Sequence, residues 1–289
     1  MSPMTEPTIR VGFVGAGNNT RRRHIPGFRA LPGIELVAVA NRTRESGERV
    51  AREFGIARVS ENWRELVRAA DVDAVCIGTW PYMHCAITLA ALAQGKHVLC
   101  EARMAMDAAE GRRMLDAALS GLNILNMGIW YEAMMRWLGP ARRVMAMTKV
   151  SVPRRRDAGG TWHEVRVPDH ADILAMLGGG AVAHLRFSAV TALAPPSEVW
   201  IFGTDGTLRL EADARRLRGG RRGNGELREI EIPAERRIGW RVEEEFVNAI
   251  RGREKVSRTT FEDGLRYMEF TEAVARSAAL GQAVDVADL

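Results

Sequence analysis

The chain has 289 residues, 46% of them hydrophobic and 27% charged with a net charge of +5, as in a globular protein of one large or two ordinary domains. No apolar run is long enough for a membrane helix and the N-terminus lacks a secretory pattern, so we expect a cytoplasmic protein without membrane partners. The arginine clusters at 21–23, 154–156 and 215–222 are scattered and carry no interleaved aromatic side chains, so we expect no nucleic-acid partner.

The first 120 residues alternate between expected strands and expected helices. Short apolar runs predict buried parallel strands, and the segments between them, closed by glycine, predict helices. The strands lie within 9–17, 34–41, 73–79 and 96–102, and the helices within 21–31, 43–55, 62–70, 84–95 and 106–119. This order predicts an α/β fold with a doubly wound parallel sheet, so we interpret residues 1–120 as a dinucleotide-binding Rossmann domain.

Three cysteines, Cys76, Cys85 and Cys100, lie inside these expected strands and helices. An odd number of cysteines without a CxxC spacing makes neither a disulfide framework nor a metal site. We therefore expect buried structural thiols and no bound metal.

The remaining residues, 121–289, show a different pattern. Helices are expected at 123–139, 240–252 and 259–281, and strands at 142–152, 161–167, 171–177, 181–190, 198–203, 206–212 and 226–232. Glycine turns join several of these strands, which favours hairpins. We expect an α+β domain with a mostly antiparallel open sheet.

Four polar segments follow successive expected strands and should meet at the carboxyl edge of the parallel sheet, where such folds bind ligands. Gly15 and Gly17 are the first two glycines of a G-x-G-x-x-G pattern, and Thr20 stands in the third place. The glycines let the backbone approach a pyrophosphate, which the following helix N-terminus also attracts. The expected cofactor-binding residues are Gly15, Gly17, Asn18, Asn19, Thr20, Asn41, Arg42, Thr43, Thr79, Trp80, Pro81, His84 and Glu101.

The end of the second strand indicates which cofactor is preferred. A carboxylate there would bind the adenosine ribose of NAD, but the chain has Asn41-Arg42-Thr43. Arg42 and Thr43 can donate to a 2′-phosphate, and no carboxylate repels it. We expect NADP, with NAD as the alternative; a solvated surface position is the alternative for Arg42.

With these residues in place, the chain resembles the Gfo/Idh/MocA family of NAD(P)-dependent oxidoreductases. The likeness is carried by "GFVGAGN" (12–18), "DAVCIGTWPYMHCAITLAALAQGKHVLCEA" (73–102) and "WRVEEEFVNAIRG" (240–252). The resemblance implies a Rossmann domain followed by a domain with an open sheet, used for substrate and for oligomer contacts. It also implies hydride transfer on sugars, cyclitols or related polyols.

The catalytic positions depart from the family. Its Glu-Lys-Pro reads Glu101-Ala102-Arg103 here, and an arginine cannot exchange a proton. The family's Asp and His align with Asn126 and Trp130, neither of which is a general base. The remaining catalytic candidates are therefore Arg103, Tyr131 and Glu132, and the substrate candidates are Asn126, Trp130 and Arg155.

A strand, a helix and another strand of the family are missing between Leu119 and Ser120. A sheet shortened in this way would expose an edge or an apolar face, so we expect a homo-oligomer formed through the second domain. The altered residues leave two main hypotheses open: a polyol oxidoreductase with rearranged catalytic groups, or a cofactor-binding or interaction protein that has lost its chemistry. Transient oxidation during elimination or glycoside cleavage is a third.

Overall fold

The structure is a computed structural model that describes residues 7–102, 104, 106, 127–156, 160–165 and 168–288. Two compact units divide the chain, residues 1–190 with 242–289 and residues 191–241. Three earlier predictions fall on residues that the structure does not describe. They are the helix expected at 106–119 apart from Met106, the shortened segment at Leu119, and the candidates Arg103 and Asn126. The division into domains at residue 120 stays a prediction.

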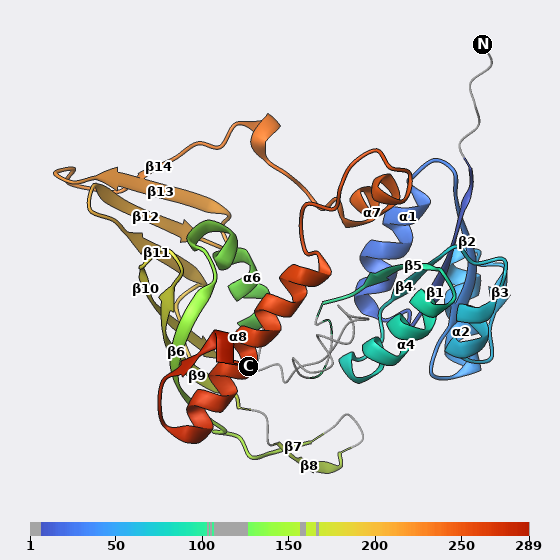
Figure 1. Cartoon of the computed structure of the whole chain (residues 1–289), viewed down its shortest axis with the longest axis horizontal. Coiled ribbons are helices and arrows are strands. Elements are labelled where there is room, and N and C mark those ends of the chain that lie inside the picture. The colour runs from blue at the N-terminus through green and yellow to red at the C-terminus, as the bar shows by residue number, and fades with distance from the viewer. Residues whose placement is uncertain are drawn as a thin grey trace. The chain divides into compact units, whose positions relative to one another are not determined.

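A five-stranded parallel sheet forms the first part of the larger unit (Figure 1). Its order is β3-β2-β1-β4-β5. The strands are β1 (Ile9–Val14), β2 (Ile34–Ala40), β3 (Arg58–Val59), β4 (Ala74–Ile77) and β5 (His97–Cys100). Each neighbouring pair runs parallel, so the predicted doubly wound sheet is confirmed.

Helices cover both faces of this sheet, as right-handed crossovers require. They are the π-helical turn η1 (Thr20–His24), α1 (Ile25–Arg29), α2 (Arg44–Phe54), α3 (Trp63–Arg68) and α4 (Pro81–Ala93). Alternate residues of the strands point to opposite faces of the sheet and belong to two separate hydrophobic cores. Val11, Phe13 and Cys76 pack with α1 and α2 on one face, whereas Val75 and Ile77 pack with α3 and α4 on the other.

Local signals account for where the helices begin and end. Thr43 accepts a hydrogen bond from the Ser46 N–H and so caps α2, which ends at Gly55 in a left-handed conformation. Asn62 caps α3 in the same way, accepting from the N–H groups of Arg64 and Glu65. Thr43, the first residue of the helix expected within 43–55, is therefore its N-cap.

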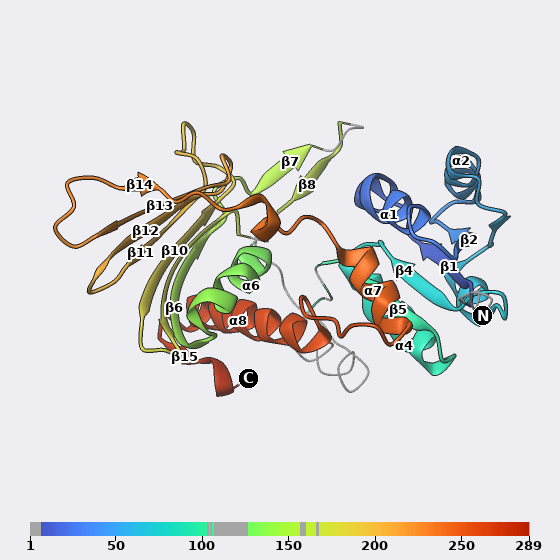
Figure 2. The ribbon, with the colours of Figure 1, turned by 90° about the horizontal axis from the view of Figure 1, so that it is seen from above.

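The larger unit also contains a four-stranded antiparallel sheet of order β10-β9-β6-β15. Its strands are β6 (Ala141–Lys149), β9 (His170–Leu177), β10 (Val182–Ser188) and β15 (Val284–Asp285), and a separate hairpin joins β7 (Arg154–Arg156) to β8 (Trp162–Glu164). The helices α6 (Met127–Leu138) and α8 (Phe261–Leu280) pack together beside β6, as Figure 2 shows. The short helix η3 (Val286–Asp288) ends the described chain, and α7 (Val242–Ile250) adds Val247 to the parallel-sheet core.

The smaller unit is an antiparallel sheet of order β11-β12-β13-β14. Its strands are β11 (Glu198–Phe202), β12 (Gly206–Glu211), β13 (Arg216–Arg221) and β14 (Arg228–Glu229), followed by the 3-10 turn η2 (Ala234–Arg236). The second half of the chain thus has antiparallel sheets, as predicted, but the sequence pattern missed β7, β13 and the two-residue β15. The strands β7 and β13 are rich in arginine, so they lack the apolar alternation by which a strand is recognised.

The cysteines are free, with Cys76 and Cys85 buried and Cys100 partly so. Burial raises the pKa values of the Cys76 and Cys100 thiols, so both stay protonated near neutral pH. In the described part of the chain, no helix is long and apolar enough to cross a membrane.

Candidate functional site

The loop after β1 brings two glycines to the carboxyl edge of the parallel sheet. Gly15 has a φ of +79°, and a Cβ there would lie 2.7 Å from the backbone nitrogen of Thr79, so only glycine fits. At Gly17 a Cβ would meet no protein atom closer than 3.6 Å. The described protein atoms therefore do not require glycine at position 17.

A helix begins directly after these glycines. Residues 18–29 are helical without a break, and the Arg21 N–H is bonded to the carbonyl of Gly17. The N–H groups of Asn18, Asn19 and Thr20 precede this bond and belong to the open end of the helix. Asn18 and Asn19 are exposed, so their N–H groups and the helix dipole are available to an anion.

Thr20 occupies the third glycine position and is buried beneath the loop. Its hydroxyl donates to Glu101 Oε1 at 2.6 Å. Gly78 makes room for this contact, because a Cβ on Gly78 would lie 2.7 Å from the Gly15 carbonyl oxygen and 2.8 Å from Glu101 Oε1. The glycine missing from position 20 is thus compensated by one on the neighbouring strand end, and Thr20 bonds with Glu101 instead of contacting a ligand.

The segment after β2 supports the same loop. The Asn41 side-chain oxygen accepts from the Ala16 N–H at 2.8 Å, and its amide donates to Ser46. Asn41 therefore holds the glycine loop against α2. Arg42 is exposed beside it.

The segment after β4 presents its aromatic residues to solvent. Trp80 is 69% and Tyr82 59% exposed, while Pro81 forms the first turn of α4. His84 is buried, and its Nε2 lies 2.8 Å from the carbonyl oxygen of Thr79. His84 therefore stabilises the turn between β4 and α4. Trp80 is an exposed aromatic side chain at this edge of the sheet.

A buried polar cluster that the sequence analysis missed lies beneath the glycine loop. His24 Nδ1 is 2.5 Å from Glu243 Oε1, and its Nε2 is 3.5 Å from Glu101 Oε1. His24 and Glu243 are almost completely buried. No local pattern could have revealed this contact, since the two residues are 219 positions apart in the chain.

The catalytic candidates on α6 are engaged in packing. Tyr131 is buried and stacks on Phe270, with ring centroids 3.7 Å apart, and its hydroxyl accepts from the Ala141 N–H at 2.7 Å. Burial raises the pKa of Tyr131 to about 12. The structure therefore gives Tyr131 a packing role, and an acid–base role near neutral pH does not fit its surroundings.

Glu132 is also buried, and it joins two segments of the chain. It pairs with Arg136 one turn along α6 and accepts a hydrogen bond from the Thr259 hydroxyl at 2.8 Å, just before α8. Trp130, the substrate candidate on the same helix, is half-buried. Glu132 is thus held by partners within the protein and is not brought together with the glycine loop by any described contact.

The substrate candidate Arg155 lies on β7 of the small hairpin. It is within 3.5 Å of the carboxylate of Asp169. Hydrogen bonds from the N–H groups of Ser151 and Val152 lower the pKa of Asp169 and keep it ionised. Arg155 therefore has a fixed counter-charge, and the three-arginine strand is an exposed structural element of the hairpin.

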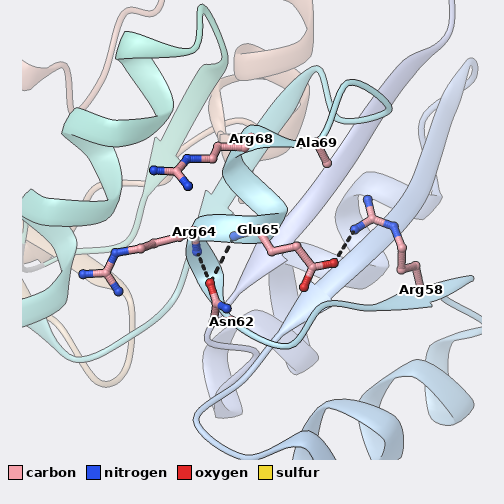
Figure 3. Close-up of a pocket in the computed structure, with 6 residues that line it drawn as sticks. All are labelled: Arg58, Asn62, Arg64, Glu65, Arg68 and Ala69. Atoms are coloured by element: carbon pink, nitrogen blue, oxygen red, sulfur yellow. Dashed lines mark hydrogen bonds and ion pairs between the residues drawn. The ribbon is translucent and has the colours of Figure 1, made fainter.

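A pocket of about 480 Å³ opens on the surface beside α3 (Figure 3). Arg58, Arg64, Arg68 and Glu65 line it with Asn62 and Ala69, and Figure 3 shows Arg64 and Arg68 directed away from Arg58. Its lining includes no residue of the glycine loop. The described residues contain no group of side chains that could hold a metal ion.

Two family models match this sequence. The model described as an oxidoreductase family with an NAD-binding Rossmann fold matches residues 9–128, and the model of the GFO/IDH/MocA C-terminal domain matches residues 88–209. The chain belongs to the Gfo/Idh/MocA family. Both models confirm the resemblance, and the first describes a family with an NAD-binding Rossmann fold.

Curated relatives match about two fifths of the chain. A dTDP-3,4-didehydro-2,6-dideoxy-alpha-D-glucose 3-reductase from Streptomyces violaceoruber is 40% identical over 114 residues, which are 39% of this chain and 33% of that protein. An inositol 2-dehydrogenase from Serratia proteamaculans is 32% identical over 123 residues, 42% of this chain and 36% of that protein. The matches thus span about a third of each relative, and the relatives are the longer proteins.

Among solved structures of the family, a levoglucosan dehydrogenase in complex with NADH and L-sorbose has a TM-score of 0.83 at 20% identity. The superposition covers 97% of this chain and 99% of that chain. At this identity the likeness establishes the fold. It confirms the Gfo/Idh/MocA architecture for both halves of the chain.

Proposed function

We propose that this protein is an oxidoreductase that transfers hydride between a nicotinamide dinucleotide and a hydroxyl carbon of a sugar, cyclitol or related polyol. The proposal depends on the glycine loop. The fold itself requires glycine at position 15, whereas glycine is required at position 17 only if a ligand approaches the backbone there. The relatives act on deoxysugar and inositol substrates, as their names state, which supports a polyol of this kind.

The residues at the sheet edge suit a dinucleotide. Gly17 and the open N–H groups of Asn18 and Asn19 would hold the pyrophosphate, with Gly15 and Thr79 shaping the turn below it. Trp80 and Pro81 would wall the pocket, and Glu101 and Thr20 would support the loop from inside. When bound, the cofactor accepts or supplies the hydride; the protein's part is to orient it and to exclude water.

The preferred cofactor in this proposal is NADP. Arg42 is exposed at the end of β2, where the adenosine ribose lies in this fold, and Glu45, the carboxylate nearest along the chain, is within 3.6 Å of Arg49. A guanidinium there can bind a 2′-phosphate through charge-assisted hydrogen bonds. Thr43 and His84 have structural contacts of their own and would contribute less.

Replacement of Arg42 tests this preference. Arg42→Ala should weaken NADP binding about tenfold, or roughly 1.4 kcal/mol, and leave NAD binding unchanged. The measurement is a calorimetric titration with each cofactor. Arg44→Ala, on the next turn and paired with Glu48, is the matched control. Equal losses for both cofactors in Arg42→Ala would contradict the proposed 2′-phosphate contact.

The proposed catalytic group is Arg103, with Asn126 and Trp130 toward the substrate. Arg103 would supply positive charge to the substrate oxygen but could not take its proton. Tyr131 and Glu132 are not proposed as catalytic groups because their polar atoms are hydrogen-bonded to other residues of the protein. The substrate itself or solvent would then have to supply the proton acceptor.

A second candidate function follows from the same observations. With Tyr131 buried and Glu132 paired, the described residues of α6 offer no free acid–base group, which favours a protein that binds the cofactor without chemistry. A panel of sugars, cyclitols and polyols, followed by the absorbance of the reduced nicotinamide, separates the two candidates. Turnover of any member supports the oxidoreductase; cofactor binding without turnover supports the second candidate.

We also propose that two copies associate through the antiparallel sheet of β6, β9 and β10. One face of this sheet packs on α6 and α8, and the other carries apolar side chains that are 49% to 77% exposed: Met145, Met147, Leu174, Met176 and Val182. The strand register places Met145 opposite Leu174 and Met176 opposite Val182, so the residues form one continuous patch. Such a patch is costly in water unless it is covered, and a second copy would present the same apolar surface.

A further inference from the structure

The hydroxyl of Thr20 reaches across the parallel sheet to Glu101. Thr20 begins the turn η1, which follows the glycine loop at the end of β1. Glu101 follows β5, and β4 lies between β1 and β5 in the sheet. Neighbouring strands are about 5 Å apart, so the 2.6 Å hydrogen bond joins segments that leave strands roughly 10 Å apart. Longer distances separate Thr20 Oγ1 from the Gly15 carbonyl oxygen (3.4 Å) and Glu101 Oε1 from His24 Nε2 (3.5 Å).

This hydrogen bond crosses the end of β4, where residue 78 is glycine. A Cβ on Gly78 would overlap Thr20 Oγ1 and lie 2.8 Å from Glu101 Oε1, the two atoms that the bond joins. Gly78 is not among the glycines with a positive φ, so it is required for space and not for its conformation. Thr20, Gly78 and Glu101 therefore form one arrangement, in which the glycine lets the other two residues meet.

The glycine loop is fixed on its other side by β2 and the residue after it. The Gly15 N–H donates to the Ala40 carbonyl at 2.9 Å, and the Ala16 N–H donates to the Asn41 side chain at 2.8 Å. These bonds hold the beginning of the loop, and the Thr20 hydroxyl holds its end. The N–H groups proposed to bind the pyrophosphate lie between the two anchors, so both anchors determine where these groups are.

We propose that Thr20 is a positioning residue for the dinucleotide: its hydroxyl, through Glu101, fixes the end of the glycine loop in the arrangement that binds the pyrophosphate. The side chain of Thr20 is completely buried, so it acts without touching the ligand. The proposal rests on the proposed cofactor site. It gives the residue in the third glycine place a tethering role, where a glycine would allow close packing of helix and strand.

A loop released from Glu101 should bind the cofactor more weakly. Without the hydrogen bond, the loop adopts its binding arrangement for only part of the time, and the apparent affinity falls in proportion to that fraction. One hydrogen bond to a carboxylate is strong enough to lower this fraction about tenfold. The pyrophosphate is common to NADPH and NADH, so both should lose affinity equally, whereas the loss expected for Arg42→Ala is confined to the phosphorylated cofactor.

The test is a calorimetric titration of the whole protein with NADPH and with NADH. Thr20→Val keeps the shape of the side chain and removes the hydroxyl, whereas Thr20→Ser keeps the hydroxyl and removes the methyl group. Thr271→Val is the matched control, because Thr271 is also buried and its hydroxyl donates to the Tyr267 carbonyl at 2.7 Å, on α8. The free energy of unfolding of each variant shows that it is folded under the conditions of the titration.

We expect Thr20→Val to bind both cofactors about tenfold more weakly although it is folded, and Thr20→Ser to bind them like the wild type. Thr271→Val should lose stability without losing affinity. A purely structural role of Thr20 would lower the free energy of unfolding and leave the affinity of the folded protein unchanged. Wild-type affinity in Thr20→Val would therefore overturn the proposal, and so would equal losses in Thr20→Val and Thr20→Ser.

A double variant tests whether Thr20 acts through Glu101. In a Glu101→Ala background, Thr20→Val should cause little further loss of affinity, because the acceptor is already absent. A further tenfold loss would contradict the route through Glu101. If Thr20→Val does not fold, Glu101→Ala alone decides, and wild-type affinity in it would overturn the proposal. Failure of the wild type to bind either cofactor would instead contradict the proposed function itself.

Discussion

Two glycines of the loop after β1 are required for different reasons. Gly15 combines a φ of +79° with close contact to Thr79, so its requirement is conformational and steric. Gly17 has neither constraint, and an added methyl group would make ordinary van der Waals contact, its nearest protein atom being 3.6 Å away. A ligand that needs to touch the backbone explains Gly17, whereas the fold alone explains Gly15.

The two positions should therefore respond differently to alanine. Gly17→Ala should change the free energy of unfolding by less than about 1 kcal/mol but weaken cofactor binding at least about tenfold. Gly15→Ala should lower the free energy of unfolding by about 2 kcal/mol or more. Thermal unfolding and calorimetric titration of both variants measure this. Normal cofactor affinity in Gly17→Ala would contradict the proposed pyrophosphate site.

Sequence reasoning located this loop but not the cluster beneath it. Glycine spacing and the residues after each strand are local signals, so Gly15, Gly17 and Asn41 could be assigned to the sheet edge from the pattern alone. His24 and Glu243 come together only in the folded protein. In the sequence alone, each is an ordinary polar residue of an expected helix. Tyr131 shows the reverse case: a titratable residue near the expected motif is in fact a core residue.

Among the elements, α6 contacts both α8 and the start of β6 through the side chain of Tyr131. Tyr131 stacks on Phe270 of α8, and its hydroxyl satisfies the buried N–H of Ala141. The raised pKa of Tyr131 means that the folded protein resists its ionisation. The stabilising contribution of the neutral hydroxyl is fully present below pH 10.0 and is lost as pH rises toward about 12.

Removal of this hydroxyl distinguishes a packing role of Tyr131 from a catalytic role. Tyr131→Phe keeps the stacking but leaves the Ala141 N–H without its acceptor, so the free energy of unfolding should fall by about 1–3 kcal/mol. The variant should also lose less stability than the wild type when pH is raised above 10.0. Denaturant unfolding at neutral and alkaline pH measures both effects. Unchanged stability together with lost turnover would restore Tyr131 as a catalytic residue.

The arginine-rich strands β7 and β13 show why the antiparallel sheets were harder to predict than the parallel sheet. Buried parallel strands are continuous apolar runs and stand out in a sequence. Strands with exposed faces are identified by alternation, which Arg154–Arg156 does not have. The hairpin pairing in which Arg155 lies opposite His163 depends on contacts between strands, and the sequence pattern of either strand alone does not contain it.

At the scale of the whole molecule, the apolar patch on β6, β9 and β10 predicts association of two copies. Leu174→Glu places a charge at its centre and should weaken the self-association at least about tenfold, because the charge would have to lose its water in the interface. Leu92→Glu makes the same change at an exposed position of α4 and is the control. Sedimentation velocity over a range of concentrations measures the effect. A wild type that stays monomeric at all concentrations would contradict the proposed interface.

Direct titration of the wild-type protein with NADPH and NADH tests most simply whether the edge of the parallel sheet binds a nicotinamide dinucleotide. We expect both cofactors to bind and NADPH to bind at least about tenfold tighter, a difference of roughly 1.4 kcal/mol. If neither cofactor binds, the glycine loop is only a structural turn, and the proposed oxidoreductase function is contradicted.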